Sequence, residues 1–147
     1  MDDIKSVKNH LKGLKRNDWD KLFALIPLIE SCEKFVISGG FVEDIQNPDS
    51  FIITPIIETE VVLDFEKIMY ELELVIPFGW SNWTIGREIV SKGVFENLDT
   101  ITLLKILTAI IRNNRFCDGA LADRFEDKTI EKILKQLKRN IDLDNGN

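Results

Sequence analysis

The stretch RNNRFCDGALADRF, residues 112–125, gathers most of the side chains in this sequence that could do chemistry. Arg112 and Arg115 are three residues apart, which places them on one face of a helix, and Asp118 follows them closely. The planar guanidinium group of arginine suits carboxylates and phosphates, and the free N–H groups at the start of a helix attract anions. This pattern is typical of an anion site, although Asp118 could itself be the anion.

Two interpretations of the stretch follow. In the first, Arg112, Arg115 and Asp118 form a charged structural joint between two helices, with Asp118 as the N-cap of the second helix. In the second, the same residues and Trp80 bind a small molecule or an anion, as part of a binding domain or an enzyme. We favour the structural joint, because the chain supplies its own carboxylate in Asp118.

Other reactive residues have a simple structural explanation. His10 is the only histidine, so triads and metal sites built on histidine are hard to assemble. Cys117 has no general base near it in the sequence. Asp64, Glu66 and Glu71 could form a carboxylate pair or a Mg²⁺ site, but they read more simply as a solvated helix face. The sequence therefore predicts neither a metal site nor a cofactor.

Trp80 and Trp83 leave a further choice open. They lie around the turn PFGWSNW, where two large aromatic side chains either line a ligand pocket or pack between helices. Packing is the simpler interpretation.

The composition limits the class of protein. A chain of 147 residues predicts a single domain, and a net charge of −6 argues against nucleic acid as a partner. No apolar run reaches the length of a membrane span. The two cysteines form no C-x-x-C motif, and the polar N-terminus does not resemble a signal peptide. We therefore expect a cytoplasmic protein with two reduced thiols.

The spacing of apolar residues predicts a single mainly helical domain with a minor two-stranded β element. The strands are FVISGGF and SFIITPI, which are β-branched and separated by turn residues. The chain is expected to form six or seven helices, over residues 4–17, 18–29, 60–76, 82–89, 100–116, 119–125 and 130–141. The helix that begins at residue 100 is apolar on most sides, so we expect it at the centre of the core.

Several residues predict where these helices begin, break and end. Pro27 must kink or break the second helix, because it has no N–H group and crowds the preceding turn. Thr59 and Asp99 are expected N-caps. Pro77 should end the third helix, and residues 142–147 should form a frayed tail.

The most distinctive segments of the chain are VIPFGW and LLKILTAIIRNNRFCDGALADRFEDKTIEKILKQL, together with LFALIPLIE. On these segments, much of the chain resembles DUF6508, a prokaryotic family of unknown function. It is weakest before Asn17 and in the 34–58 region. The shared motif is specific for the family rather than for a chemistry.

Two classes of function remain. The first is a non-enzymatic interaction or regulatory module that binds a protein partner, or a second copy, through a helical face. The second is a small-molecule or anion-binding domain with a site around Trp80, Arg112, Arg115 and Asp118. We favour the first, because an enzyme should show a recognisable nucleophile, base or metal set.

Overall fold

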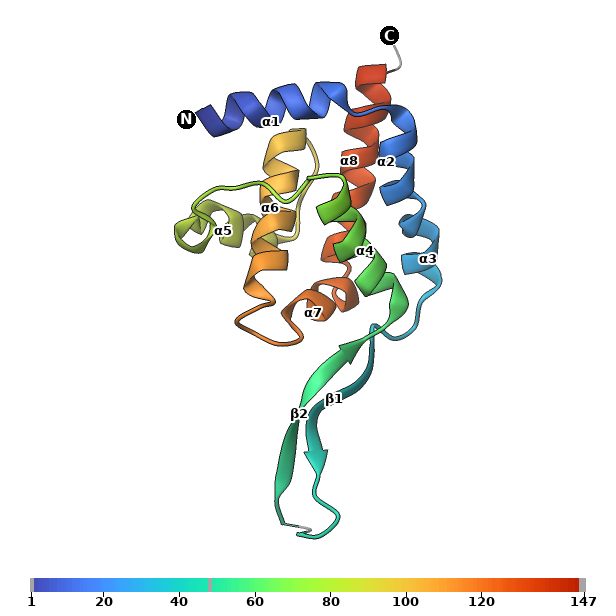
Figure 1. The fold of residues 1–147 in the computed structure, drawn as a ribbon, viewed down its shortest axis with the longest axis vertical. Helices are drawn as coiled ribbons and strands as arrows, with labels where there is room; N and C mark the ends of the chain where they lie inside the picture. The colour runs from blue at the N-terminus through green and yellow to red at the C-terminus, as the bar shows by residue number, and fades with distance from the viewer. Residues whose placement is uncertain (1, 48, 146–147) are drawn as a thin grey trace.

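A helical body and a protruding β hairpin make up the chain, in a computed structural model that describes residues 2–47 and 49–145 (Figure 1). The hairpin, called the arm below, consists of antiparallel strands β1 (Val36–Glu43) and β2 (Phe51–Glu58). The body consists of α1 (Asp2–Gly13), α2 (Arg16–Phe23), α3 (Leu25–Ser31), α4 (Glu60–Glu71), the 3-10 turn η1 (Trp80–Asn82), α5 (Thr84–Lys92), α6 (Thr100–Asn113), α7 (Ala120–Glu126) and α8 (Thr129–Asn145). The prediction of a mainly helical domain with a two-stranded β element is confirmed.

Helix α6 lies at the centre of the body and contacts α5, α7 and α8. Leu103, Leu104 and Leu107 on this helix are completely buried. Asp99 begins it, because its Oδ1 accepts a hydrogen bond from the N–H of Thr102 at 3.2 Å. The predictions of a central helix and of its N-cap are both confirmed.

The second predicted helix is broken as expected. Helix α2 ends at Phe23 and α3 begins at Leu25. Pro27 has no N–H to donate to the carbonyl of Phe23, four residues earlier, and its ring crowds that carbonyl. When α2 and α3 are counted as one broken helix, the described residues contain seven α-helices, as predicted.

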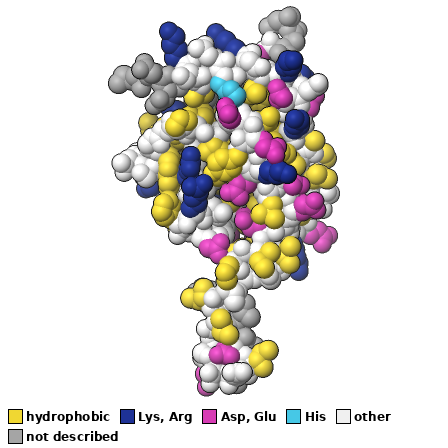
Figure 2. Space-filling view, in the orientation of Figure 1, with side chains coloured by type: hydrophobic (Ala, Val, Ile, Leu, Met, Phe, Trp, Pro, Cys, Tyr) yellow, Lys and Arg dark blue, Asp and Glu magenta, His cyan; other side chains and the backbone are white. Residues whose placement is uncertain are grey.

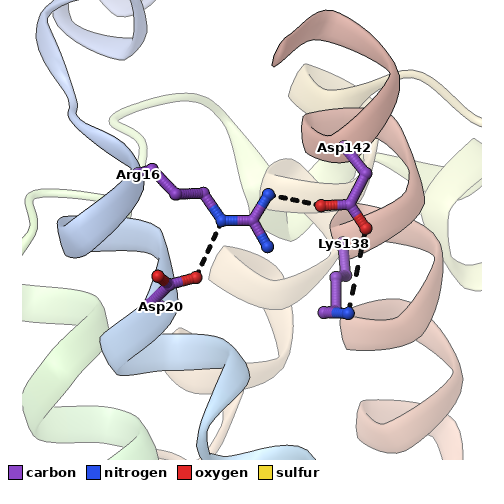
Figure 3. A network of polar contacts seen from close by, with 4 residues as sticks. All are labelled: Arg16, Asp20, Lys138 and Asp142. Carbon is purple, nitrogen blue, oxygen red and sulfur yellow. Dashed lines mark hydrogen bonds and ion pairs between the residues drawn. The ribbon is translucent and has the colours of Figure 1, made fainter. Parts of the chain in front are cut away.

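Helix α8 extends further than predicted. It runs to Asn145 rather than to residue 141, so residues 142–145 of the expected frayed tail are helical; residues 146 and 147 lie outside the described residues. The Arg16 guanidinium pairs with both Asp142 and Asp20, and Lys138 lies 3.8 Å from Asp142 (Figure 3). Arg16 holds the pKa of Asp142 below its usual value. These contacts tie the last turns of α8 to α2.

The third predicted helix is shorter than expected. Helix α4 ends at Glu71, well before Pro77, because Glu73 adopts a left-handed φ of 55°. The N–H of Leu74 then donates to the carbonyl of Met69 at 2.8 Å, which is the closing bond of a Schellman motif. Leu74 itself is completely buried, so packing of the residue after the turn ended the helix.

Helix α1 crosses the end of the body opposite the arm (Figure 1). His10 fixes it there, because its Nε2 lies 2.8 Å from the carbonyl oxygen of Leu72, just after α4. The side chains of Val7 and Leu11 pack against the core. The histidine therefore joins two helices, and its role in the described structure is positional.

Candidate functional site

The loop between α6 and α7 meets the base of the arm. There the N–H of Ile56, in β2, donates to Oδ2 of Asp118 at 2.7 Å. The expected N-cap role of Asp118 is therefore wrong: its carboxylate binds the arm instead of the helix that follows it. This contact joins residues far apart in the sequence, so local spacing could not reveal it.

Helix α7 obtains its cap from a different residue. It begins at Ala120, two residues after Asp118, and Oδ1 of Asn114 accepts a hydrogen bond from the N–H of Leu121 at 3.0 Å. Gly119 separates Asp118 from the helix with a φ of 89°. A Cβ at Gly119 would lie 2.5 Å from Cδ1 of Ile56. The glycine therefore permits both the turn and the close approach of the arm.

The two arginines of the loop do not share a helix turn. Helix α6 ends at Asn113, so Arg112 lies in its last turn and Arg115 lies beyond it. Arg115 donates from Nη2 to the hydroxyl of Tyr70 at 3.3 Å, which links the loop to α4. Arg112 makes no ion pair within the described part of the chain.

Two half-buried carboxyl groups at the base of the arm, those of Glu58 and Glu66, have raised pKa values. Burial raises the pKa of Glu58, and the charges of Glu66 and Asp118 raise it further. Burial also raises the pKa of Glu66, although the positive charge of Arg115 opposes this shift. Oε2 of Glu58 is buried and forms no hydrogen bond with a described group. Glu66 was expected on a solvated face, so its environment is more restricted than the sequence suggested.

The body contains a cavity of about 620 Å³ between α5, α6 and α7, called the α5–α7 cavity below. Ile106, Ala109 and Ile110 of α6 are among its apolar lining residues. The other lining residues are Trp80, Trp83, Gly86, Arg87, Val90, Ser91, Asn113, Ala120, Asp123 and Arg124.

The two tryptophans of the cavity are also packed against other aromatic rings. Trp80 stacks on Phe116 with ring centroids 6.0 Å apart, and Trp83 meets Phe78 edge-on at 5.3 Å. A Cβ at Gly86 would lie 2.3 Å from the Trp83 ring, so only glycine lets this indole lie against α5. The tryptophans thus combine the two roles between which the sequence left a choice: they pack, and they line a cavity.

Only one of the four predicted ligand-binding residues lines this cavity. Trp80 does, whereas Arg112, Arg115 and Asp118 do not belong to its lining. Arg87 and Arg124 take the place of the predicted arginines there. Sequence reasoning missed them because they lie on different helices and belong to no common motif.

The arm exposes large apolar side chains along its length. Ile37, Ile45, Phe51, Ile52, Ile53 and Ile57 are each between 47 and 95% exposed. Successive side chains of a strand point to opposite faces, so Phe51 and Ile53 lie on one face of the arm and Ile52 on the other. Hydrophobic and acidic side chains are visible on the arm in Figure 2. Residues 35–66 contain no lysine or arginine.

A second hollow of the surface lies at the other end of the body. This groove, called the α1 groove below, has a volume of about 780 Å³. Its α1 wall carries Lys8, Leu11 and Lys12. Apolar side chains of other helices, including Leu98, Ile101 and Ile141, complete it.

Neither a metal cluster nor a membrane span is found in the described residues. Among them, no group of three or more His, Cys, Asp or Glu side chains could hold a metal ion. No described helix is long and apolar enough to cross a membrane. Cys32 and Cys117 are both free.

These features define a small helical domain with a β-hairpin arm, a cavity beside two tryptophans that is open to solvent, and a surface groove. The family model described as "Family of unknown function (DUF6508)" matches residues 14–142, and the chain belongs to this family. No curated protein and no solved structure matches the chain. The matched range includes the whole arm and the α5–α7 cavity.

Proposed function

We propose that this protein is an interaction module that uses its arm to bind a second copy of itself. The observation that carries the proposal is the exposure of six large apolar side chains on an element that stands away from the body. Exposed apolar surface of this kind is typical of protein interaction sites.

The arm is suited to contact a partner through its side chains rather than through its edges. A two-stranded hairpin is only marginally stable alone in water. Pro55 has no N–H to offer to a further strand, and the N–H of the next residue, Ile56, is already bound to Asp118. The pairing of β1 with β2 is also irregular between Val36 and Gly40, and such irregularities disfavour further strand pairing. The apolar faces are therefore the available binding surface.

The α1 wall of the groove complements the arm in polarity and charge, whereas Asp99 and Asp144 line other parts of the groove. The arm combines apolar residues with Asp44 and Asp49 and has no positive charge. The α1 wall of the groove combines Leu11 with Lys8 and Lys12, which share one helix face because they are four residues apart. A strand of eight residues spans roughly 26 Å, so an arm is long enough to follow α1, whose 12 residues span roughly 18 Å.

The positions of the arm and the groove allow a closed dimer. The arm projects from one end of the body, and α1 lies at the opposite end (Figure 1). In an antiparallel pair related by a twofold axis, each arm reaches the groove of the other copy. Both contacts then form at once, which doubles the surface buried by one arm.

The two free thiols are consistent with a reducing compartment. We accordingly propose the cytoplasm as the location of the module, and the resemblance to a prokaryotic family suggests a prokaryotic cell.

Light scattering after size-exclusion chromatography tests the proposal. We expect the wild-type protein at about 100 µM to have twice the mass of the chain. Ile53→Glu should give a monomer, because it places a charge on the apolar face of the arm. Ile85→Glu is the matched control, since Ile85 is also exposed but lies on α5, outside both the arm and the groove.

Charge-reversal variants test whether the α1 groove is the surface to which the arm binds. Reversing Lys8 and Lys12 to Glu should weaken the dimer, and reversing Asp44 and Asp49 to Lys in the same chain should restore it. A wild-type protein that stays monomeric at this concentration overturns the proposal, and the partner of the arm would then be a different protein. A dimer that persists in Ile53→Glu also overturns it.

A further inference from the structure

The α5–α7 cavity has the size of a small-molecule site. Its volume of about 620 Å³ lies within the range of roughly 300–1,000 Å³ that ligand pockets occupy. One part of its lining is apolar, from Ile106, Ala109 and Ile110, and another part is aromatic, from Trp80 and Trp83. Apolar surface with a few convergent polar groups is typical of such sites.

Arg87 is the charged group in this cavity that is best placed to receive a ligand. Its Nη2 donates to the carbonyl oxygen of Ser81 at 2.8 Å, which holds the guanidinium in position. No carboxylate of the described residues pairs with it, whereas Arg124 is paired with Asp127, with Nη1 and Oδ2 2.9 Å apart. The remaining N–H groups of Arg87 can therefore bind a carboxylate, for which the guanidinium fork is well suited.

The charges that line the cavity favour a ligand with a single negative charge over one with two. Asp123 lines the same cavity and forms no ion pair with a described residue. With Arg124 paired with Asp127, the lining carries one further positive charge, on Arg87, and one negative charge, on Asp123. A doubly charged group such as a phosphate monoester would meet repulsion from Asp123. A carboxylate meets less repulsion and still pairs with Arg87.

We propose that the α5–α7 cavity binds a planar aromatic carboxylate, with its rings against Trp80 and Trp83 and its carboxylate on Arg87. Indole rings favour flat partners because offset stacking adds to the burial of apolar area. This inference goes beyond the proposed self-association, because it uses other residues and another face of the body. Each proposal can fail without the other.

The indole N–H signals of the three tryptophans provide a direct test. In ¹H–¹⁵N correlation spectra of the full chain, we expect 2-naphthoate to shift the signals of Trp80 and Trp83. Trp19 lies outside this cavity, so its signal is an internal control. The neutral analogue 2-naphthalenemethanol should bind at least about tenfold more weakly, because it cannot form the charge-assisted hydrogen bonds. Acetate, which has no ring, should leave all three signals unchanged.

Two variants distinguish the contact of Arg87 with the carboxylate from the binding of the rings in the cavity. Arg87→Gln should weaken 2-naphthoate about tenfold and leave the neutral analogue unchanged, whereas Arg112→Gln, outside the cavity, should change neither. Ser91→Phe should weaken both ligands, because Ser91 is an exposed lining residue of the cavity and a ring there would occupy part of it. Equal affinities for the acid and the alcohol, or equal effects of the two arginine variants, overturn the proposal. Shifts confined to Trp19 also overturn it.

Discussion

Phe65 in the body and Phe51 in the arm are the same residue type in opposite environments. Phe65 is completely buried, and its ring meets that of Phe125 edge-on at 5.4 Å. Phe51 is 66% exposed at the start of β2. The buried apolar residues of the body are thus accounted for by the folding of one chain, although single apolar side chains such as Ile85 and Phe116 are exposed there as well. The exposed apolar residues of the arm are not accounted for in this way, which is why we assign them to a partner.

The comparison extends to the charges. Acidic and basic side chains of the body are often paired, as in the contacts of Arg16 with Asp20 and Asp142 (Figure 3). In the arm and at its base the charges are all acidic up to Lys67. Several charges of the body are therefore compensated within the chain, whereas the arm contains no basic residue that could compensate its acidic ones.

Replacing each of these two phenylalanines with alanine should give the largest contrast. Phe65→Ala should lower the free energy of unfolding by about 3–5 kcal/mol, because it removes a ring from the core and leaves a cavity. Phe51→Ala should change it by less than about 0.5 kcal/mol, as for other exposed positions. Urea titrations at a concentration where the protein is monomeric measure both. A loss of several kcal/mol in Phe51→Ala would mean that the arm packs on its own body.

The sequence predicted the body more fully than the arm. Apolar residues at helical spacing found the core faces of α6 and α8, since burial in one chain imposes that period. Pro27 and Asp99 act on backbone groups within four residues of themselves, so the helix break and the helix start that they cause were also predictable. The strands were also found, but their pattern could not reveal that the hairpin leaves the body, because an exposed apolar strand and a buried one have the same composition.

The candidate site was harder to predict because its contacts are long-range. Asp118 was placed as a helix cap on local grounds, yet its partner is Ile56 in the arm. Asn114 caps α7 from seven residues before Leu121, outside the usual capping interval. Arg87 and Trp80 come together with α7 only in the folded body. Local sequence rules predict where a helix ends, but the tertiary fold determines which loop side chain caps it.

Two alanine substitutions in the α6–α7 loop should have different effects, one on the stability of the body and one on the attachment of the arm. Asn114→Ala should lower the free energy of unfolding by about 0.5–2 kcal/mol, because the N–H of Leu121 loses its acceptor. Asp118→Ala should act on the arm, so that the amide of Ile56 exchanges with solvent faster while that of Leu121 does not. Hydrogen exchange followed by NMR measures both amides. Faster exchange of Leu121 in Asp118→Ala would restore Asp118 to the role of a cap.

Glu58→Gln should show a smaller effect that depends on pH. Burial and two neighbouring carboxylates raise the pKa of Glu58 above its ordinary 4.5, so the folded chain binds this proton more tightly than the unfolded chain does. The associated stability is complete below the ordinary pKa and is lost as the pH rises through the raised pKa of the folded state. At pH 7 the wild type carries a destabilising charge that glutamine removes. We therefore expect Glu58→Gln to raise Tm by about 1–3 °C at pH 7, and the gain to vanish near pH 4.

The control for this prediction is Glu126→Gln, which removes one negative charge from an exposed position on α7. If the gain came only from the lower net charge of the chain, the two variants would behave alike at every pH. A gain specific to Glu58 instead identifies repulsion at the base of the arm, where Glu66 and Asp118 converge on the same carboxyl group. A lower Tm of Glu58→Gln at pH 7 would show that the charged carboxylate stabilises the junction. The carboxylates at the base of the arm would then be stabilising, like the paired charges of the body, and unlike the uncompensated charges of the arm.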